Sequence, residues 1–135
     1  MQTKLGHVVF SINGSNRGFY RDLFNFLGWQ TIYDGDGMLG IYDSNQTSVW
    51  FGDATKSHAN DYDAPGLNHF AVHTAAQSEV DDAVDYLRKQ GIAPLFDTPR
   101  HRPEFSSDPN ATYYQVMFET PDRILGEIVY IGPKS

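Results

Sequence analysis

The chain begins with a strand-like run whose two faces differ in character. Residues 5–12 are rich in β-branched, aromatic and aliphatic side chains, which is typical of a β-strand. The even-numbered positions Val8, Phe10 and Ile12 are all apolar, whereas the odd-numbered positions include His7. Successive strand residues point to opposite faces of a sheet. We therefore expect the apolar side to meet helices and His7 to lie on the other face.

The rest of the first half has the pattern of one helix followed by three strands. Apolar residues recur at helical spacing at Phe19, Leu23 and Phe26, and Gly28 follows at a position typical of a helix end. The Asp-Gly-Asp-Gly sequence at residues 34–37 predicts a tight hairpin. The expected strands lie near residues 29–34, 38–43 and 47–52.

The second half repeats this order of elements. A strand is expected near residues 67–74, and Ser78 is expected to cap a helix that ends at Gly91. The apolar stripe of that helix consists of Val80, Ala83, Val84 and Leu87. Further strands are expected near residues 92–97, 112–118 and 124–131.

The two halves also align residue by residue, which indicates an internal repeat. Residues 6–12 align with residues 68–74, so that His7 matches His69. Two later segments align in the same way, residues 28–34 and 91–97. Two copies of one unit usually pack about a shared axis, so matched residues can converge on one site.

The repeat predicts the fold class and the layout of the chain. Each half reads β-α-β-β-β, so we expect an α+β fold of two βαβββ units that form an open, cupped mixed sheet around a central site. The layout is one domain over residues 1–135, with a first unit at 1–52, a linker at 53–66 and a second unit at 67–135.

Composition limits the classes of protein that the chain can represent. Hydrophobic residues make up 40% of the chain and aromatic residues 14%, which is normal for a folded domain. There is no cysteine, so disulfide bonds and thiolate metal sites are excluded. No apolar run approaches the roughly 20 residues of a membrane helix, and the N-terminus lacks a signal-peptide core. We expect a cytoplasmic protein with no membrane partner.

The charge of the chain argues against one class of partner. The formal net charge is −7, so the phosphates of a nucleic acid would be repelled. We therefore expect a small-molecule substrate and no nucleic acid.

Three residues are of the types that bind metal ions in proteins. His7 and His69 occupy matched positions on matched strands, and Glu127 is a lone carboxylate in the apolar run 124–130. A buried carboxylate is costly unless it is paired or bound to a cation. Two histidines and one carboxylate suit a divalent first-row metal with open coordination positions. A histidine in a strand is more often structural when taken alone, and the repeat match is what favours the metal.

The same residues carry a resemblance to a known family. The paired βαβββ units, the early histidine in each unit and residues 120–127 (Thr-Pro-Asp-Arg-Ile-Leu-Gly-Glu) resemble the vicinal oxygen chelate superfamily. This group includes glyoxalase I, the bleomycin-resistance proteins, the fosfomycin thiol transferases and the extradiol dioxygenases. In its Asp-Pro-Asp-Gly-x-x-x-Glu segment, Thr120 replaces the first Asp and Arg123 replaces the Gly. The helix segment 19–23, followed by Leu-Gly, also resembles the family pattern.

The resemblance implies a site and a range of activities. It makes His7, His69 and Glu127 the ligands of one divalent ion, which could be Zn, Fe, Mn or Ni. It implies an enzyme that forms a homodimer and acts on a small oxygen-chelating metabolite or xenobiotic. Lyase, isomerase, dioxygenase and thiol transferase reactions stay open. The alternative is a metal-free protein that sequesters a small molecule, as the bleomycin-resistance proteins do.

One departure from the family concerns glyoxalase I itself. That enzyme uses a fourth ligand, a glutamate on the last strand of the first unit. Matching Glu127 back to this strand places Trp50 there, and an indole cannot bind a hard divalent metal. The chain is therefore not expected to be an authentic glyoxalase I, and Trp50 becomes a candidate for substrate binding.

Five other residues are candidates for catalysis or substrate binding. His73 lies four positions after His69 on the same strand side, and it could transfer protons. A hydrogen-bonded structural histidine is the alternative for His73. One of the neighbouring tyrosines should line the pocket while the other packs, with Tyr114 a catalytic candidate and Tyr113 a substrate-binding one. Arg100 and Arg102 lie in the segment 98–111, which could be a lid over the metal and could hold an anionic substrate. A solvated loop is the more common outcome for such a segment.

Overall fold

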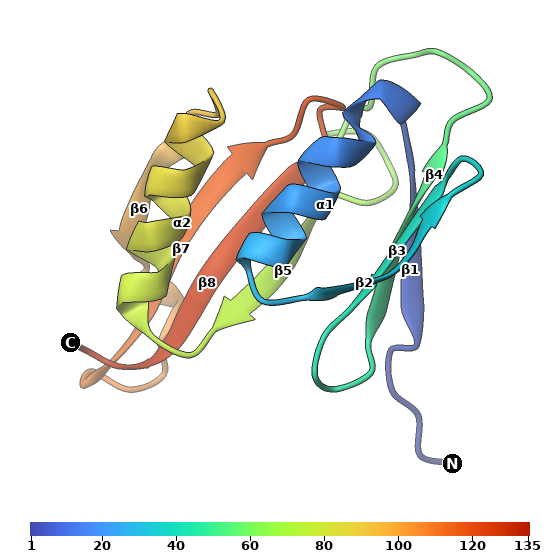
Figure 1. Cartoon of the computed structure of the whole chain (residues 1–135). Coiled ribbons are helices and arrows are strands. Elements are labelled where there is room, and N and C mark those ends of the chain that lie inside the picture. Colours follow the sequence, from blue (N-terminus) through green and yellow to red (C-terminus); the bar gives the residue numbers. More distant parts are fainter. The chain divides into compact units, whose positions relative to one another are not determined.

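The computed structural model describes residues 1–135, and the chain divides into two compact units, Met1–His58 and Ala59–Ser135. Each unit contains one α-helix and one four-stranded mixed sheet (Figure 1). Neither α-helix has the length and the apolar character that a membrane-spanning helix requires.

The first unit has the order β-α-β-β-β. Its first strand pairs in parallel with its last, and the strand order in the sheet is β1-β4-β3-β2. The elements are β1 (His7–Ile12), the short 3-10 helix η1 (Gly14–Asn16), α1 (Arg17–Phe26), β2 (Gln30–Gly35), β3 (Met38–Tyr42) and β4 (Ser48–Asp53).

The second unit has the same topology, with the strand order β5-β8-β7-β6 and β5 parallel to β8. Its elements are β5 (His69–Thr74), α2 (Gln77–Lys89), β6 (Leu95–His101), the 3-10 helix η2 (Pro103–Phe105), β7 (Ala111–Glu119) and β8 (Leu125–Pro133). The predicted α+β class and the pair of βαβββ units are therefore confirmed.

Aromatic packing forms the core of the first unit. Phe51 is fully buried and stacks on Tyr20 of α1 with ring centroids 4.3 Å apart, and on Phe10 at 5.4 Å. Phe10 and Ile12 are buried as the alternation predicts, whereas Val9 is 55% exposed. The helix therefore covers the even-numbered face of β1, and His7 lies on the uncovered face.

The predicted apolar stripe forms the core of the second unit. Val80, Ala83, Val84 and Leu87 of α2 are all buried. The predicted start of this helix is wrong, because α2 begins at Gln77 rather than after a cap at Ser78. The carboxylate of Glu79 accepts the backbone N–H groups of Ala75 (2.8 Å) and Ala76 (3.0 Å), so Glu79 satisfies two backbone donors immediately before the helix.

The strand β6 continues further than the sequence predicts. Arg100 and His101 pair with Gln115 and Tyr114 of β7, so they belong to the sheet and not to a loop. The hydroxyl of Thr98 donates to Leu95 O (2.6 Å) and accepts from Met117 N (2.9 Å). These two bonds satisfy backbone groups at the irregular part of the strand, so pairing resumes after it. The loop predicted for residues 98–111 starts only after His101.

A backbone irregularity precedes Thr98. Phe96 and Asp97 both have positive φ values, 57° and 54°, and the register of β6 shifts between Leu95 and Arg100. Left-handed backbone is unfavourable for residues with a Cβ atom and is rare for a bulky side chain such as phenylalanine. This pair of residues therefore stores strain at the edge of the second sheet.

The second half of the predicted linker is attached to the second unit. The Tyr62 hydroxyl donates to Glu119 Oε2 (2.9 Å), and the Asn60 amide donates to Arg123 O (2.9 Å). Residues 59–66 therefore lie against the β7–β8 turn of that unit.

The strain at Asp97 leads to a stability prediction. Asp97→Gly is expected to raise the free energy of unfolding by about 0.5–1 kcal/mol, because glycine adopts positive φ without a steric penalty. Asp97→Ala is the matched control, since it removes the same carboxylate but keeps the Cβ atom. Urea denaturation measures both variants. An equal gain in the alanine variant would assign the effect to charge and not to backbone conformation.

Candidate functional site

Glu127 is the buried centre of a polar cluster in the second unit. The residue lies in the middle of β8 and is 3% exposed. Its Oε1 atom accepts a hydrogen bond of 2.5 Å from the Tyr113 hydroxyl. With its amide nitrogen facing the carboxylate, Gln115 donates a second bond to Oε1 (3.0 Å). The other oxygen, Oε2, lies 3.1 Å from Nε2 of His69.

The sheet register explains why these side chains meet. Glu127 pairs with Ala71 of β5 and with Met117 of β7, so residues two positions away on each neighbour share its face. Those residues are His69 and His73 on β5 and Gln115 on β7. The face opposite to Glu127 is the one that α2 covers.

Tyr113 is a neutral hydrogen-bond donor to the carboxylate. Burial, followed by the hydrogen bond to Glu127 and its negative charge, raises the pKa of Tyr113 from 10.0 to about 12. The phenol therefore keeps its proton at neutral pH. Together with Gln115 it occupies Oε1, which leaves Oε2 as the oxygen available to a cation.

A chain of hydrogen bonds fixes the ring nitrogens of His69. The Asn68 amide nitrogen donates to the Tyr62 carbonyl (2.9 Å), which orients the amide. Its oxygen then lies 2.7 Å from Nδ1 of His69 and requires a proton on that nitrogen. In the neutral ring the free lone pair is therefore on Nε2, the nitrogen that points at Glu127. A lone pair facing a carboxylate is favourable only with a proton or a cation between them.

The spacing of the two atoms fits a metal ion. Two neighbouring ligands about 2.1 Å from one ion lie roughly 3.0 Å apart when their bonds are perpendicular. The observed Nε2–Oε2 distance is 3.1 Å. No group of three His, Cys, Asp or Glu side chains that could hold a metal occurs in the structure. His69 and Glu127 therefore form a two-ligand pair, while His7 lies at the exposed start of β1 in the first unit.

The pair opens into a cavity of about 700 Å³ in the second unit. One arginine on its wall is held in place: Arg102 donates from Nε to Glu104 (2.6 Å), and its Nη1 atom lies 3.1 Å from the oxygen of the Gln115 amide. The guanidinium also lies over the Phe105 ring at 4.5 Å from its centroid. The lining residues are His69, Phe96, Arg100, Arg102, Phe105, Tyr113, Gln115, Met117 and Glu127.

The two tyrosines of β7 lie on opposite faces of the sheet. Tyr113 lines the cavity, whereas the Tyr114 hydroxyl donates to Asp81 of α2 (2.7 Å) on the covered face. The predicted catalytic role of Tyr114 does not fit this placement, because strand alternation turns it away from Glu127. His73 is exposed on the same face as His69.

The first unit holds a different residue at the position of Glu127. Trp50 pairs with Val9, just as Glu127 pairs with Ala71, the residue that matches Val9 in the repeat. The register therefore agrees with the sequence alignment of Trp50 with Glu127. The indole covers Gly40, where an added Cβ atom would lie 2.5 Å from the ring. No carboxylate occupies this matched position.

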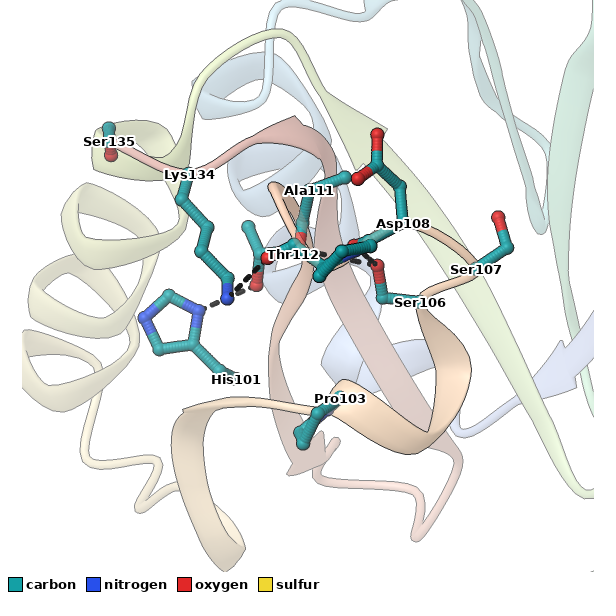
Figure 2. Close-up of a pocket in the computed structure, with 10 residues that line it drawn as sticks. His101, Pro103, Ser106, Ser107, Asp108, Ala111, Thr112, Lys134 and Ser135 are labelled. Carbon is teal, nitrogen blue, oxygen red and sulfur yellow. Dashed lines mark hydrogen bonds between the residues drawn. The ribbon is translucent and has the colours of Figure 1, made fainter.

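A second cavity, of about 580 Å³, lies where β6 ends and β7 begins, and its lining includes His101, Thr112 and Lys134 (Figure 2). His101 Nδ1 lies 2.6 Å from the Thr112 hydroxyl, and Lys134 donates to the Pro109 carbonyl (2.9 Å). These groups bind one another, and the cavity includes none of the predicted site residues.

Several residues of the Glu127 cavity were not predicted from the sequence. Gln115 could have been found from strand alternation, once β7 was placed beside Glu127. Asn68 carried no sequence signal, because its role depends on the path of the preceding loop. Phe96 and Phe105 carried no sequence signal either, because irregular backbone, which no periodic pattern predicts, positions them on the cavity wall.

Solved structures share this fold over almost the whole chain. A protein from Bacillus halodurans, provisionally assigned as a glyoxalase, matches with a TM-score of 0.79 and 25% identity over 96% of each chain. The fosfomycin resistance protein FosX from Listeria monocytogenes, complexed with Mn(II) and sulfate, matches with a TM-score of 0.68 and 18% identity over 96% of this chain and 91% of that one. A glyoxylase/bleomycin resistance protein/dioxygenase domain from Frankia sp. EAN1pec gives a TM-score of 0.65 and 16% identity over 97% and 98%.

The fold is therefore that of the glyoxalase/bleomycin resistance/dioxygenase group, the vicinal oxygen chelate superfamily, as the resemblance predicted. No protein-family model and no curated protein sequence matches the chain.

Tyr114 provides a prediction about behaviour at high pH. Burial, followed by the bond to Asp81, raises its pKa from 10.0 to about 12. The phenol then ionises in the unfolded chain before it ionises in the folded one. The stability due to neutral Tyr114 is complete below pH 10 and is lost as the pH rises through about 12.

Carbon-13 NMR of the tyrosine Cζ atoms, assigned with a Tyr114→Phe variant, measures this titration. The Tyr114 phenol is expected to remain mostly neutral at pH 11. Asp81→Asn should lower the pKa of Tyr114 but leave it above 10, because burial is the larger cause. A midpoint at 10 in the native protein would contradict the assignment.

Proposed function

We propose that the chain is a metal-dependent enzyme that acts on a small oxygen-chelating metabolite or xenobiotic. The observation that carries this proposal is the pair formed by His69 Nε2 and the buried Glu127 Oε2, 3.1 Å apart and open to a cavity. The proposed ligands of one divalent ion are His69, Glu127 and, from the first unit, His7. FosX, which shares the fold, is described in complex with Mn(II), and this supports the proposal without identifying the ion.

The residues around the pair have defined tasks in this proposal. Tyr113 and Gln115 hold Glu127 through Oε1, so that Oε2 faces the cavity, and Asn68 turns Nε2 of His69 toward the same point. A divalent ion bound there would act as a Lewis acid on substrate oxygens. His73 lies exposed on the same face and is the group proposed to transfer protons.

The reaction class stays open among lyase, isomerase, dioxygenase and thiol transferase. The second candidate function is sequestration of a small molecule without metal. The aromatic side chains on the cavity wall favour it, because Phe96 and Phe105 are 55% and 56% exposed. The two functions differ in whether the pair of Glu127 and His69 binds a cation.

Homodimer formation and a cytoplasmic location complete the proposal. The molar mass in solution tests the first, and fractionation of cells tests the second.

Metal binding is the first test of the proposal. Calorimetric titration of the chelator-treated protein with Mn(II) or Zn(II) is expected to show one site per chain. His69→Ala and Glu127→Gln should each lower the affinity by more than about 100-fold, and Asn68→Ala by about tenfold, because it releases the ring orientation. His7→Ala should also weaken binding.

His58→Ala is the matched control for this titration, since His58 is an exposed histidine outside every strand and helix. It should leave the affinity unchanged. Equal affinities in the native protein and the Glu127→Gln variant would reject the site. A loss in His69→Ala without a loss in His7→Ala would remove His7 from the ligand set.

The tryptophan at the matched position of the first unit leads to a prediction about activity. The hemithioacetal of methylglyoxal and glutathione is expected to turn over negligibly with Zn, Fe, Mn or Ni, because Trp50 supplies no fourth ligand. A spectrophotometric assay at 240 nm measures this, with an authentic glyoxalase I as the positive control. Robust turnover would contradict the assignment of Trp50.

A further inference from the structure

The cavity beside Glu127 combines three kinds of wall. Phe96, Phe105 and Met117 supply apolar surface, His69 and Glu127 form a polar end, and arginine side chains supply positive charge. Its volume of about 700 Å³ is within the usual range of small-molecule sites. The walls therefore constrain the chemical class of the ligand.

The two arginines of the cavity differ in how they are bound. Arg102 is engaged by Glu104 and Gln115 and lies over Phe105, so its positive charge is partly neutralised and its position is fixed. Arg100 is exposed and makes no side-chain hydrogen bond or ion pair. Glu104, which binds Arg102 directly, interacts with Arg100 only through charge and not through a hydrogen bond. The planar guanidinium of Arg100 is suited to a carboxylate, phosphonate or sulfonate group.

The aromatic side chains of the cavity have free ring surface. Phe105 stands edge-on to Tyr113 at 5.3 Å and receives Arg102 on one face, yet it is 56% exposed. Phe96 is 55% exposed. Exposed rings on the wall of one cavity offer stacking and edge contacts to a planar apolar group.

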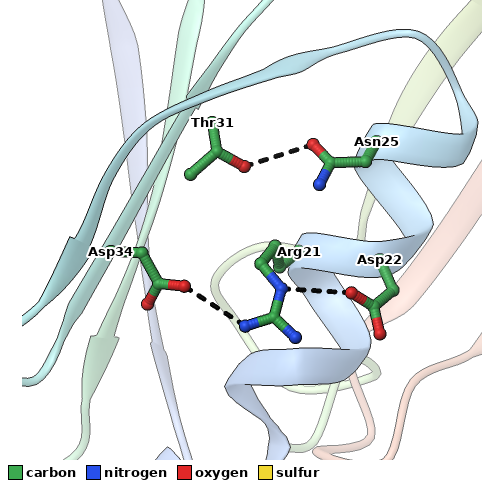
Figure 3. Close-up of polar contacts among 5 residues, drawn as sticks. All are labelled: Arg21, Asp22, Asn25, Thr31 and Asp34. Atoms are coloured by element: carbon green, nitrogen blue, oxygen red, sulfur yellow. Dashed lines mark hydrogen bonds and ion pairs between the residues drawn. The ribbon is translucent and has the colours of Figure 1, made fainter.

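Backbone strain places one of these rings. Phe96 and Asp97 adopt left-handed φ values at the shift in the register of β6. The repeat supplies the comparison, because Tyr33 and Asp34 occupy the matched positions in β2. The register of β2 also shifts, between Thr31 and Tyr33, but Tyr33 and Asp34 themselves pair with Gly40 and Leu39 of β3. Neither residue has positive φ, and Asp34 forms an ion pair with Arg21 (Figure 3). At this matched pair of positions the left-handed conformation therefore occurs only in the unit that carries Glu127, and strain of this kind is concentrated at binding sites.

From these observations we propose that this cavity binds a planar aromatic organic anion, with its ring between Phe96 and Phe105 and its anionic group on Arg100. Only one part of this inference rests on the proposed function, namely that the oxygens of the ligand lie beside Glu127. Recognition by Arg100 and the two rings needs no metal. Planar aromatic anions are a narrower class of ligand than the small oxygen-chelating molecules of the proposed function.

Binding of 2-naphthoate to the full chain in excess EDTA tests this proposal separately from metal binding. Isothermal titration calorimetry is expected to show binding of 2-naphthoate that is at least about fivefold tighter than that of the neutral 2-naphthamide. Acetate, which carries the charge without the ring, should bind negligibly. The preference for the anion should shrink as salt rises, because exposed charges are screened.

The variants separate the two parts of the site. Arg100→Gln should weaken 2-naphthoate about fivefold and leave 2-naphthamide unchanged, whereas Phe96→Ala should weaken both. The matched controls are Arg88→Gln, an exposed arginine of α2, and Phe26→Ala, a phenylalanine of the first unit that is 45% exposed. Both controls should leave both affinities unchanged.

Three results would overturn the proposal. They are equal binding of the acid and the amide to the native protein, an unchanged 2-naphthoate affinity in Arg100→Gln, and a loss in Phe26→Ala as large as that in Phe96→Ala. Thermal melting of every variant controls for unfolding, and Phe96→Leu replaces Phe96→Ala if the alanine variant does not fold. Loss of metal binding in the earlier experiment leaves these outcomes unaffected.

Discussion

A carboxylate on the uncovered face of the second sheet carries a charge that the protein has almost entirely removed from water. Glu127 is 3% exposed, and an ionised group in such a position is unfavourable by several kcal/mol unless hydrogen bonds and a positive partner compensate. The neighbouring side chains meet this requirement. Tyr113 and Gln115 donate to one oxygen, and His69 faces the other. Gln115 in turn contacts Arg102 on the cavity wall, so the geometry of the cavity depends on how the charge of Glu127 is satisfied.

The internal repeat shows how one scaffold supplies two different surfaces. The register of β1 with β4 is the same as that of β5 with β8, and Trp50 and Glu127 take the same place in it. An indole there fills the space over Gly40, whereas a carboxylate there requires donors and a cation. The backbone at residues 96–97 has diverged in the same way: the matched residues Tyr33 and Asp34 pair with β3, whereas Phe96 and Asp97 are left-handed and lie within the register shift of β6. The fold common to the superfamily therefore constrains topology, and individual side chains determine the chemistry of each face.

Sequence reasoning was most successful where it rested on periodicity. The βαβββ units, the apolar helix faces and the shared face of His69 and Glu127 all follow from alternation of residues along strands and helices. Whether Tyr113 or Tyr114 lines the cavity could not be predicted, because it depends on pairing Met117 with Glu127 across two strands. The extension of β6 depends on the two hydrogen bonds of one hydroxyl, that of Thr98. The orientation of His69 depends on a loop carbonyl at Tyr62, and no local pattern encodes such a contact.

The central claim is that His69 presents a free Nε2 atom, together with Glu127, to a divalent ion. Long-range nitrogen-15 NMR of the histidine rings observes this most directly, during titration of the chelator-treated protein with Zn(II). We expect Nδ1 of His69 to carry a proton before and after the addition, while the Nε2 resonance moves to a metal-bound frequency at one equivalent. A proton on Nε2 that persists with Zn(II) present, or a His69 spectrum that Zn(II) leaves unchanged, would contradict the account.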